Sequence, residues 1–237
     1  MKGRKLVYFA LAFIFVLASV FQTQPAPTEA AAKTGYVSIS SGKLNVRSGP
    51  GSSYKVIGSL SNNAAVTVSG QTKNGWSQIT YKKKRAYVAS KYLRMYSFLM
   101  DKTKVYTYKT NGVSYTHTYE GKNNGWDEWR DSSTRGTFVI SENSKGLYLG
   151  WPESEYYTEI SYPLKSGKTW RHDFDTRITY KITGTNGTVK TQAGTFKSIT
   201  TVQSSEGYIN YYAPKIGLVK QVYRGKTVSE LVKLAKK

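Results

Sequence analysis

The sequence predicts an all-β protein with a small, strongly bent barrel, then a larger antiparallel curved sheet or half-barrel, behind an N-terminal signal helix. Three observations predict this fold class. Short runs that alternate apolar and polar residues recur along the chain, as in half-buried strands. Asn-Gly and Gly-rich clusters separate these runs and mark turns. Little helical periodicity is found after residue 32, which leaves few candidates for helices.

The first 32 residues have the pattern of an export signal. Lys2, Arg4 and Lys5 precede an apolar run at 6–21, and small residues at 30–32 offer a cleavage site. The run is shorter than the roughly 20 residues that span a bilayer, so membrane attachment is expected only if the signal stays uncleaved. The chain has no cysteine, which excludes disulfides, thiolate nucleophiles and a lipid-attachment cysteine. We expect a secreted or wall-located protein, on the extracellular face of a Gram-positive cell.

Charge divides the remaining chain near residue 96, and we expect domains at 33–96 and 97–237. The first block holds eleven Lys and Arg residues and no Asp or Glu, whereas the second holds 21 basic and 13 acidic residues. The first block should therefore attract polyanions. For an exported protein these are teichoic acid or peptidoglycan rather than a physiological nucleic acid, although DNA binding at low salt is expected. The alternative is that the charge only aids solubility.

About six short strands are expected in residues 33–96. The alternating run at 44–47 stops at Gly49-Pro50-Gly51, where glycine permits positive φ and proline withholds a donor. The expected strands are 33–41, 44–47, 54–60, 64–68, 76–81 and 85–88, with 91–97 closing a small barrel. Ten aliphatic residues are expected to fill most of its core: Leu44, Val46, Val56, Ile57, Leu60, Val66, Val68, Ile79, Val88 and Leu93.

Three spaced motifs in this block resemble the bacterial SH3 (SH3b) domain. They read L-N-V-R-S-G-P-G-x-x-Y-x-V-I-G at 44–58, G-W-x-x-I at 75–79 and Y-V-x-x-x-Y-L at 87–93. Because several motifs agree in order over about residues 36–94, the resemblance is specific. It implies an SH3-like barrel. Several such domains hold wall peptides in a groove between two loops, and by that resemblance the groove would involve residues 44–54 and the loop near Asn74-Gly75.

The hairpin at 82–85 departs from the family, which usually has Asn, Asp or Gly in this turn. Its three lysines and Arg85 are a candidate polyanion contact, or alternatively a solvated hairpin tip. Tyrosine rings suit glycan and peptide surfaces. The candidate ligand-binding residues are Tyr54, Trp76, Tyr81, Lys82, Lys83, Lys84, Arg85 and Tyr87, with Tyr92 a further aromatic candidate. Trp76 is expected to brace the core with one exposed edge, and Arg47 either braces the 49–51 turn or touches ligand.

Residues 97–237 are expected to form eight to ten antiparallel strands, joined to the first block without a Pro- or Gly-rich linker. Turns are expected at Asn111-Gly112, 123–125 and Asn186-Gly187. The tail at 228–234 fits a helical face or a last strand, and the turn before it favours the strand. The expected strands are 104–109, 113–119, 136–141, 146–151, 158–162, 178–182, 196–203, 208–213, 218–223 and this tail.

Three motifs between residues 162 and 220 resemble a loose class of exported bacterial β-proteins of uncharacterised function. They are Y-P-L-K-x-G-x-x-W, A-G-T-F and Y-Y-A-P-x-x-G-L-V-K. Some of these proteins have curved sheets like those of lipoprotein-carrier proteins. The resemblance speaks to fold more than to activity.

Groups that could support catalysis are few. His117 lies mid-strand and is expected to be a packed or a surface residue rather than a base. His172 with Asp173 and Asp175 could bind a divalent cation, but no spacing supplies further ligands, so neither a metal nor another cofactor is expected.

Two groups of acids stand among aromatic residues, as in sugar-cleaving sites or in solvated loops. They are Asp127, Glu128 and Asp131 around Trp126 and Trp129, and Glu153, Glu155 and Glu159 around Tyr156 and Tyr157. No Gly-x-Ser-x-Gly elbow, His-Glu-x-x-His helix or phosphate loop is present.

Three functions remain open. The first is an exported, non-catalytic, cell-wall-associated protein whose SH3b module binds peptidoglycan or another anionic wall polymer. The second is a wall or glycan hydrolase with acids such as Asp127, Glu153 and Glu155. The third is a lipophilic-ligand carrier whose curved sheet encloses an apolar cavity.

Overall fold

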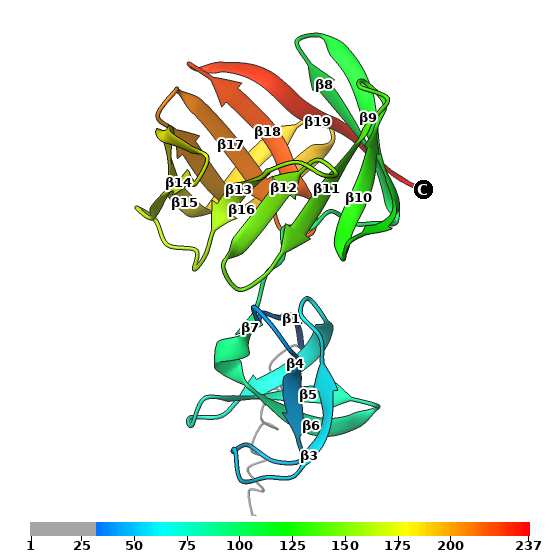
Figure 1. Cartoon of the computed structure of the whole chain (residues 1–237), viewed down its shortest axis with the longest axis vertical. Helices are drawn as coiled ribbons and strands as arrows, with labels where there is room; N and C mark the ends of the chain where they lie inside the picture. The colour runs from blue at the N-terminus through cyan, green and yellow to red at the C-terminus, as the bar shows by residue number, and fades with distance from the viewer. Residues whose placement is uncertain (1–31) are drawn as a thin grey trace, which may run out of the picture. The chain divides into compact units, whose positions relative to one another are not determined.

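The computed structural model describes residues 32–237, so the expected signal helix lies outside the described residues. In that part the chain forms nineteen strands and one 3-10 helix, which confirms the all-β prediction (Figure 1). The strands make two separate sheets, of seven and twelve strands. Within residues 32–237 no helix has the length and apolar character needed to cross a membrane.

The first sheet has the strand order β3-β2-β6-β5-β4-β1-β7, with antiparallel pairing. Its elements are β1 (Lys33–Val37), β2 (Leu44–Arg47), β3 (Val56–Leu60), β4 (Ala65–Gln71), β5 (Trp76–Tyr81), β6 (Lys84–Ala89), the 3-10 helix η1 (Ser90–Tyr92) and β7 (Leu93–Arg94). The strands predicted at 44–47 and 76–81 have the observed bounds. The closing segment, predicted as 91–97, is instead η1 followed by the two residues of β7.

The core of the first sheet differs from the prediction at β3. Its buried residues are Val37, Leu44, Val46, Val66, Val68, Ile79, Ala86 and Val88. Val56 and Ile57, predicted as core, are 44% and 39% exposed. The reason is that β3 is an edge strand, paired only with β2, and a register shift opposite Arg47 disturbs its alternation.

The second sheet has the strand order β13-β12-β11-β10-β9-β8-β19-β18-β17-β16-β15-β14, also antiparallel. Its strands are β8 (Lys104–Thr110), β9 (Val113–Asn123), β10 (Trp126–Asp131), β11 (Thr137–Glu142), β12 (Gly146–Gly150), β13 (Tyr156–Ser161), β14 (Thr169–His172), β15 (Asp175–Thr191), β16 (Gly194–Ser204), β17 (Tyr208–Ala213), β18 (Gly217–Tyr223) and β19 (Lys226–Lys236). The tail is therefore a strand, as predicted.

Two features of this sheet correct the prediction. There are twelve strands rather than eight to ten, because β10 and β14 were not recognised. The turn predicted at Asn186-Gly187 is absent: β15 runs through both residues, and register shifts against β16 on either side of Gly187 take up the irregularity. Asn-Gly makes a hairpin turn only where the residues before it pair with the residues after it, and here the residues on both sides pair with β16.

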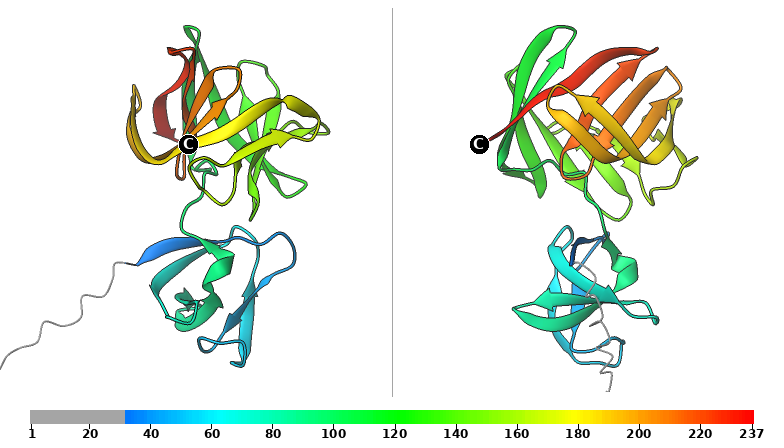
Figure 2. Two further views of the ribbon diagram at one scale, coloured as in Figure 1. Left: turned by 90° about the vertical axis from the view of Figure 1, so that its left-hand side faces the viewer. Right: turned by 180° about the vertical axis from the view of Figure 1, so that it is seen from behind.

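The two edge strands of the second sheet meet, so the sheet is nearly closed (Figure 2). Two side chains of β14 bond to one residue of β13. Trp170 Nε1 donates to the Thr158 carbonyl at 2.8 Å, and the Thr158 amide donates to His172 Nδ1 at 3.2 Å. We call these two bonds the seam. They satisfy edge groups of β13 that no strand ladder pairs.

Side chains fill the interior of the second sheet. Its largest fully buried residues include Trp129, Tyr106, Tyr212 and Phe98, with Ile160, Ile182, Ile199 and Leu231 beside them. An apolar cavity of about 90 Å³ remains among Phe98, Tyr115, Leu147 and their neighbours. Pockets for drug-sized ligands usually measure about 300–1,000 Å³, so this cavity is too small for a bulky lipid.

Candidate ligand-binding surfaces

The turn after β2 is built on the contact between Gly49 and Tyr54. A Cβ placed on Gly49 would lie 2.2 Å from Tyr54 Cδ1, so only glycine lets the ring lie on the turn. Arg47 Nη1 donates to the Tyr54 carbonyl at 2.8 Å. Arg47 therefore braces this turn. The Tyr54 side chain, 48% exposed, keeps surface available to a ligand.

The 44–54 segment and the Asn74-Gly75 loop, predicted to border a groove, touch each other at one point. Asn74 Nδ2 donates to the Pro50 carbonyl at 2.9 Å, which joins the two loops directly.

A groove of about 590 Å³ lies beside β2 and includes Leu44, Asn45 and Arg47 of the 44–54 segment. Its wall includes residues of the 38–45 segment together with Arg47, Trp76, Lys91 and Tyr92. Trp76 is half-buried and lines this groove, and it is not among the side chains packed on the core, which corrects the prediction that it braces the core. The cations Lys43, Arg47 and Lys91 face the groove, and no carboxylate does. Lys91 Nζ lies 5.0 Å from the Tyr92 ring centroid.

The lysine-rich hairpin between β5 and β6 ends in two residues of positive φ. Lys82 has φ 49° and Lys83 has φ 64°, and Tyr81 pairs with Lys84 across the turn. This is the two-residue geometry that favours Asn and Gly, so lysine is conformationally costly here. Both lysines are exposed, as are Lys84 and Arg85. The tip is therefore a compact cluster of four cations.

The eight predicted site residues do not form one site: four of them make up the tip at 82–85, and the four aromatic residues lie apart from one another. Trp76 lines the groove, and Tyr54 lies on the Gly49 turn. Tyr81 packs against the core and over Gly58, where a Cβ would meet its hydroxyl at 2.3 Å. Tyr87 is half-buried on β6, opposite Arg47. The structure adds Lys43 and Lys91: Lys43 lies outside the motifs, and Lys91 stands at an unspecified position of the 87–93 motif.

The first acidic group of the second sheet is structural. Asp127 is buried on β10, and its Oδ1 lies 2.7 Å from Lys102 Nζ and 2.5 Å from Lys122 Nζ. Glu128 accepts a hydrogen bond from Thr137 Oγ1 at 2.7 Å. Two cations hold Asp127, so it does not have the free carboxyl that a sugar-cleaving site requires.

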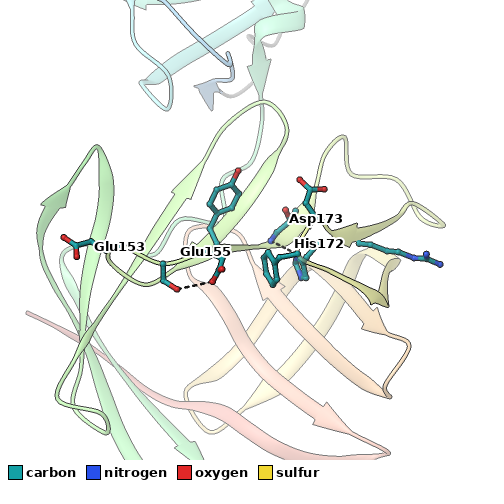
Figure 3. Close-up of a pocket in the computed structure, with 9 residues that line it drawn as sticks. Glu153, Glu155, His172 and Asp173 are labelled. Carbon is teal, nitrogen blue, oxygen red and sulfur yellow. Dashed lines mark hydrogen bonds between the residues drawn. The ribbon is translucent and has the colours of Figure 1, made fainter.

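The second acidic group meets the His172 motif across the seam. Glu153 and Glu155 are exposed on the rim of a groove of about 610 Å³, whose other wall carries Arg171, His172 and Asp173. Figure 3 shows the Glu153 side chain pointing away from His172. The sequence treats these motifs as unrelated, since a seam between edge strands leaves no local signal.

The two histidines are engaged in the interior. His172 Nδ1 accepts the Thr158 amide, and burial lowers the pKa of His172 although Asp175 and Asp173 raise it. His117 packs between Tyr108 and Phe138, the first of the two predicted alternatives, and its Nε2 lies 3.4 Å from Asp131 Oδ2. Burial lowers the pKa of His117, against the opposing charge of Asp131. Within residues 32–237 no group of three metal-ligating side chains is found.

Comparison with known proteins identifies the class of the first sheet. Residues 42–94 match the family model described as the bacterial SH3 domain, which confirms the resemblance. The probable endopeptidase p60 of Listeria seeligeri is 43% identical over 67 residues, in the same region. That stretch is 28% of this chain and 13% of the relative, so the chain spans only a small part of the relative's length.

Proposed function

We propose that this is an exported cell-wall-associated protein whose bacterial SH3 domain binds an anionic wall polymer, peptidoglycan or teichoic acid, without catalysing a reaction. The observation that carries the proposal is the groove along β2. It presents Lys43, Arg47 and Lys91 beside the rings of Trp76 and Tyr92, and no acid.

This combination suits a polymer that carries both negative charge and sugar or peptide surfaces. Cations attract the polymer through a field that salt screens, and the exposed faces of aromatic rings contact its uncharged parts. The whole 33–96 block reinforces the field, because its eleven basic residues have no acidic neighbour within the block. The tip at 82–85 adds four of these cations.

The relative described as a probable endopeptidase supports a wall-related role only through the shared bacterial SH3 region. The alternative of a wall or glycan hydrolase is not favoured by the surroundings of its candidate acids. Asp127 is neutralised by two lysines, while Glu153 and Glu155 stand exposed on a groove rim. The carrier alternative is not favoured either, because the interior cavity measures only about 90 Å³.

Sedimentation with purified Gram-positive walls tests the proposal. The protein lacking residues 1–32 is mixed with walls, with and without teichoic acid, at rising salt. We expect sedimentation at low ionic strength that weakens as salt rises. If the protein no longer sediments with walls that lack teichoic acid, teichoic acid is the ligand. If it still sediments with them, peptidoglycan is the ligand. A protein that stays in the supernatant at low salt refutes the proposal.

Trp76→Ala localises binding to the groove. Because a large aromatic side chain at the centre of an interface often carries much of the binding energy, we expect about a tenfold loss of wall affinity. Trp151→Ala is the matched control, since Trp151 is 48% exposed on the second sheet. Equal affinity of the two variants would place the binding surface elsewhere. A zymogram on wall preparations that shows clearing would overturn the non-catalytic part of the proposal.

A further inference from the structure

Glu159 on β13 differs from the two fully buried acids of the second sheet. Glu142 has Arg94 at 2.8 Å, and Asp127 has two lysines. Glu159 takes part in no ion pair of residues 32–237, and its hydrogen-bond partner there is the Tyr212 hydroxyl. Desolvation raises the pKa of Glu159, and the bond from Tyr212 opposes this shift only in part. Glu159 is thus a desolvated carboxyl group that has no counter-charge from residues 32–237.

Glu159 opens into a groove of about 380 Å³ formed by β13 to β18. The groove wall contains Glu159 and Glu206 but neither lysine nor arginine. The protein as a whole has 35 basic and 14 acidic residues, so an acidic groove without any cation runs against its composition. Nothing in the wall would repel a positively charged ligand.

Aromatic rings line the groove beside Glu159. The ring centroids of Tyr157 and His172 are 5.1 Å apart, and those of His172 and Tyr180 are 4.7 Å apart. Trp170 stacks behind Tyr180 at 5.8 Å and keeps that ring in place. Because burial lowers the pKa of His172 and its Nδ1 accepts the Thr158 amide, His172 is a neutral part of this wall.

A chain of hydrogen bonds orients the carboxyl group. Gln221 Nε2 donates to Asn210 Oδ1 at 3.0 Å, and Asn210 Nδ2 donates to the Tyr212 hydroxyl at 3.3 Å. The Tyr212 proton is thereby directed to Glu159 Oε2. No hydrogen bond within residues 32–237 engages Glu159 Oε1, so this oxygen is available to a ligand.

We propose that this groove binds a small organic ammonium ion, with its charge against Glu159 and its alkyl surface on the Tyr157, His172 and Tyr180 rings. Aromatic faces attract ammonium groups electrostatically, most strongly where water is excluded, and a nearby carboxylate supplies the counter-charge. The ligand would provide the cation that the chain provides to Glu142 and Asp127. This site lies on the second sheet and does not depend on wall binding by the first.

Titration with choline chloride tests the inference, and 3,3-dimethyl-1-butanol serves as the neutral probe of the same shape. The protein lacking residues 1–32 is followed by isothermal calorimetry and NMR at neutral pH. We expect saturable choline binding in roughly the millimolar range and at least about tenfold weaker binding of the alcohol. Equal binding of both probes, or no saturable binding of choline up to about 100 mM, overturns the inference.

Variants identify the counter-charge. Glu159→Gln keeps an acceptor for Tyr212 and should weaken choline binding about tenfold. Glu120→Gln, an exposed acid paired with Arg130 on the outside of the sheet, should leave it unchanged. Should Glu159→Gln fail to fold, Tyr180→Leu replaces it and should weaken binding similarly. Unchanged choline affinity in the folded variant overturns the inference. All of these variants should sediment with walls as the natural chain does. A failure of choline binding can therefore be told apart from a failure of the proposed wall binding.

Discussion

Arg94 Nη2 lies 2.8 Å from Glu142 Oε2, and water is excluded from both side chains. Glu142 also accepts hydrogen bonds from Ser97 Oγ at 2.6 Å, from the Phe98 amide at 3.1 Å and from the Tyr162 hydroxyl. Burial and the charge of Glu142 raise the pKa of Tyr162, which keeps its hydroxyl a donor. One carboxylate of β11 therefore fixes the segment that follows β7, where the chain has no linker sequence.

Arg94→Met should destabilise the protein by about 3 kcal/mol, because it leaves the Glu142 charge buried without a partner cation. The double variant Arg94→Met with Glu142→Gln should recover much of that loss, since no buried charge remains. Urea unfolding followed by tryptophan fluorescence measures both. Arg130→Met, which breaks the exposed and solvent-screened pair with Glu120, should cost far less. A loss no larger in Arg94→Met than in this control would contradict the prediction.

Replacing Lys82 and Lys83 by Asn and Gly should stabilise the first sheet by about 1–2 kcal/mol. Both positions have positive φ, which lysine adopts at a cost and Asn-Gly adopts readily. The same variant should bind walls more weakly at low salt, because it removes two cations from the tip. Thermal unfolding and sedimentation measure the two effects.

The matched control for this pair is Lys190→Gln with Lys197→Gln, which removes the same charge from exposed positions of the second sheet. If the control loses as much wall affinity as the tip variant, total charge rather than the tip determines binding.

Gly49→Ala should destabilise the first sheet by about 1–3 kcal/mol, because the new Cβ would overlap the Tyr54 ring. Adding Tyr54→Ser should restore most of the loss, as the clash disappears with the ring. Gly70→Ala is the control, since nothing lies within 4 Å of its Cβ position. Additive effects of the Gly49 and Tyr54 changes in chemical unfolding would show that the contact does not exist.

Glu159→Gln should make the protein more stable than the natural chain at pH 7, with the advantage disappearing below about pH 4.5. The folded-state pKa of Glu159 is raised, so its protonated form is favoured and stability falls as pH rises through the folded pKa. Tyr212, His172, Tyr180 and Glu206 face the same groove and are unchanged in the variant. Urea midpoints measured from pH 4 to pH 8 check this, and a constant difference over that range would contradict it.

Local patterns predicted much of the fold. The strands 44–47, 76–81 and 208–213 have the predicted bounds because alternation and turn residues coincide there. β10 was missed because Trp-Asp-Glu-Trp-Arg-Asp has the composition of a surface loop, although Asp127 and Trp129 are both buried. Lys122, which pairs with Asp127 across the hairpin, and Lys102, which lies 25 residues earlier, make that burial of Asp127 tolerable.

The candidate sites were harder to predict for the same reason. Trp76 was recognised, but its groove depends on how the 38–45 segment packs beside Lys91 and Tyr92. Glu159 was noted among aromatic residues, yet its partners Asn210, Tyr212 and Gln221 lie more than fifty residues later. Such sites arise from strand order, which periodicity does not encode.

The seam closes the second sheet with side-chain hydrogen bonds instead of a strand ladder. Thr158 and His172 border both the groove that holds Glu159 and the groove beneath Glu153. When His172 takes up a proton, its Nδ1 can no longer receive the Thr158 amide, and half of the closure is lost. In acid, the Trp170–Thr158 bond would remain as the hydrogen bond of the seam, so the wall shared by the two grooves would be held less firmly.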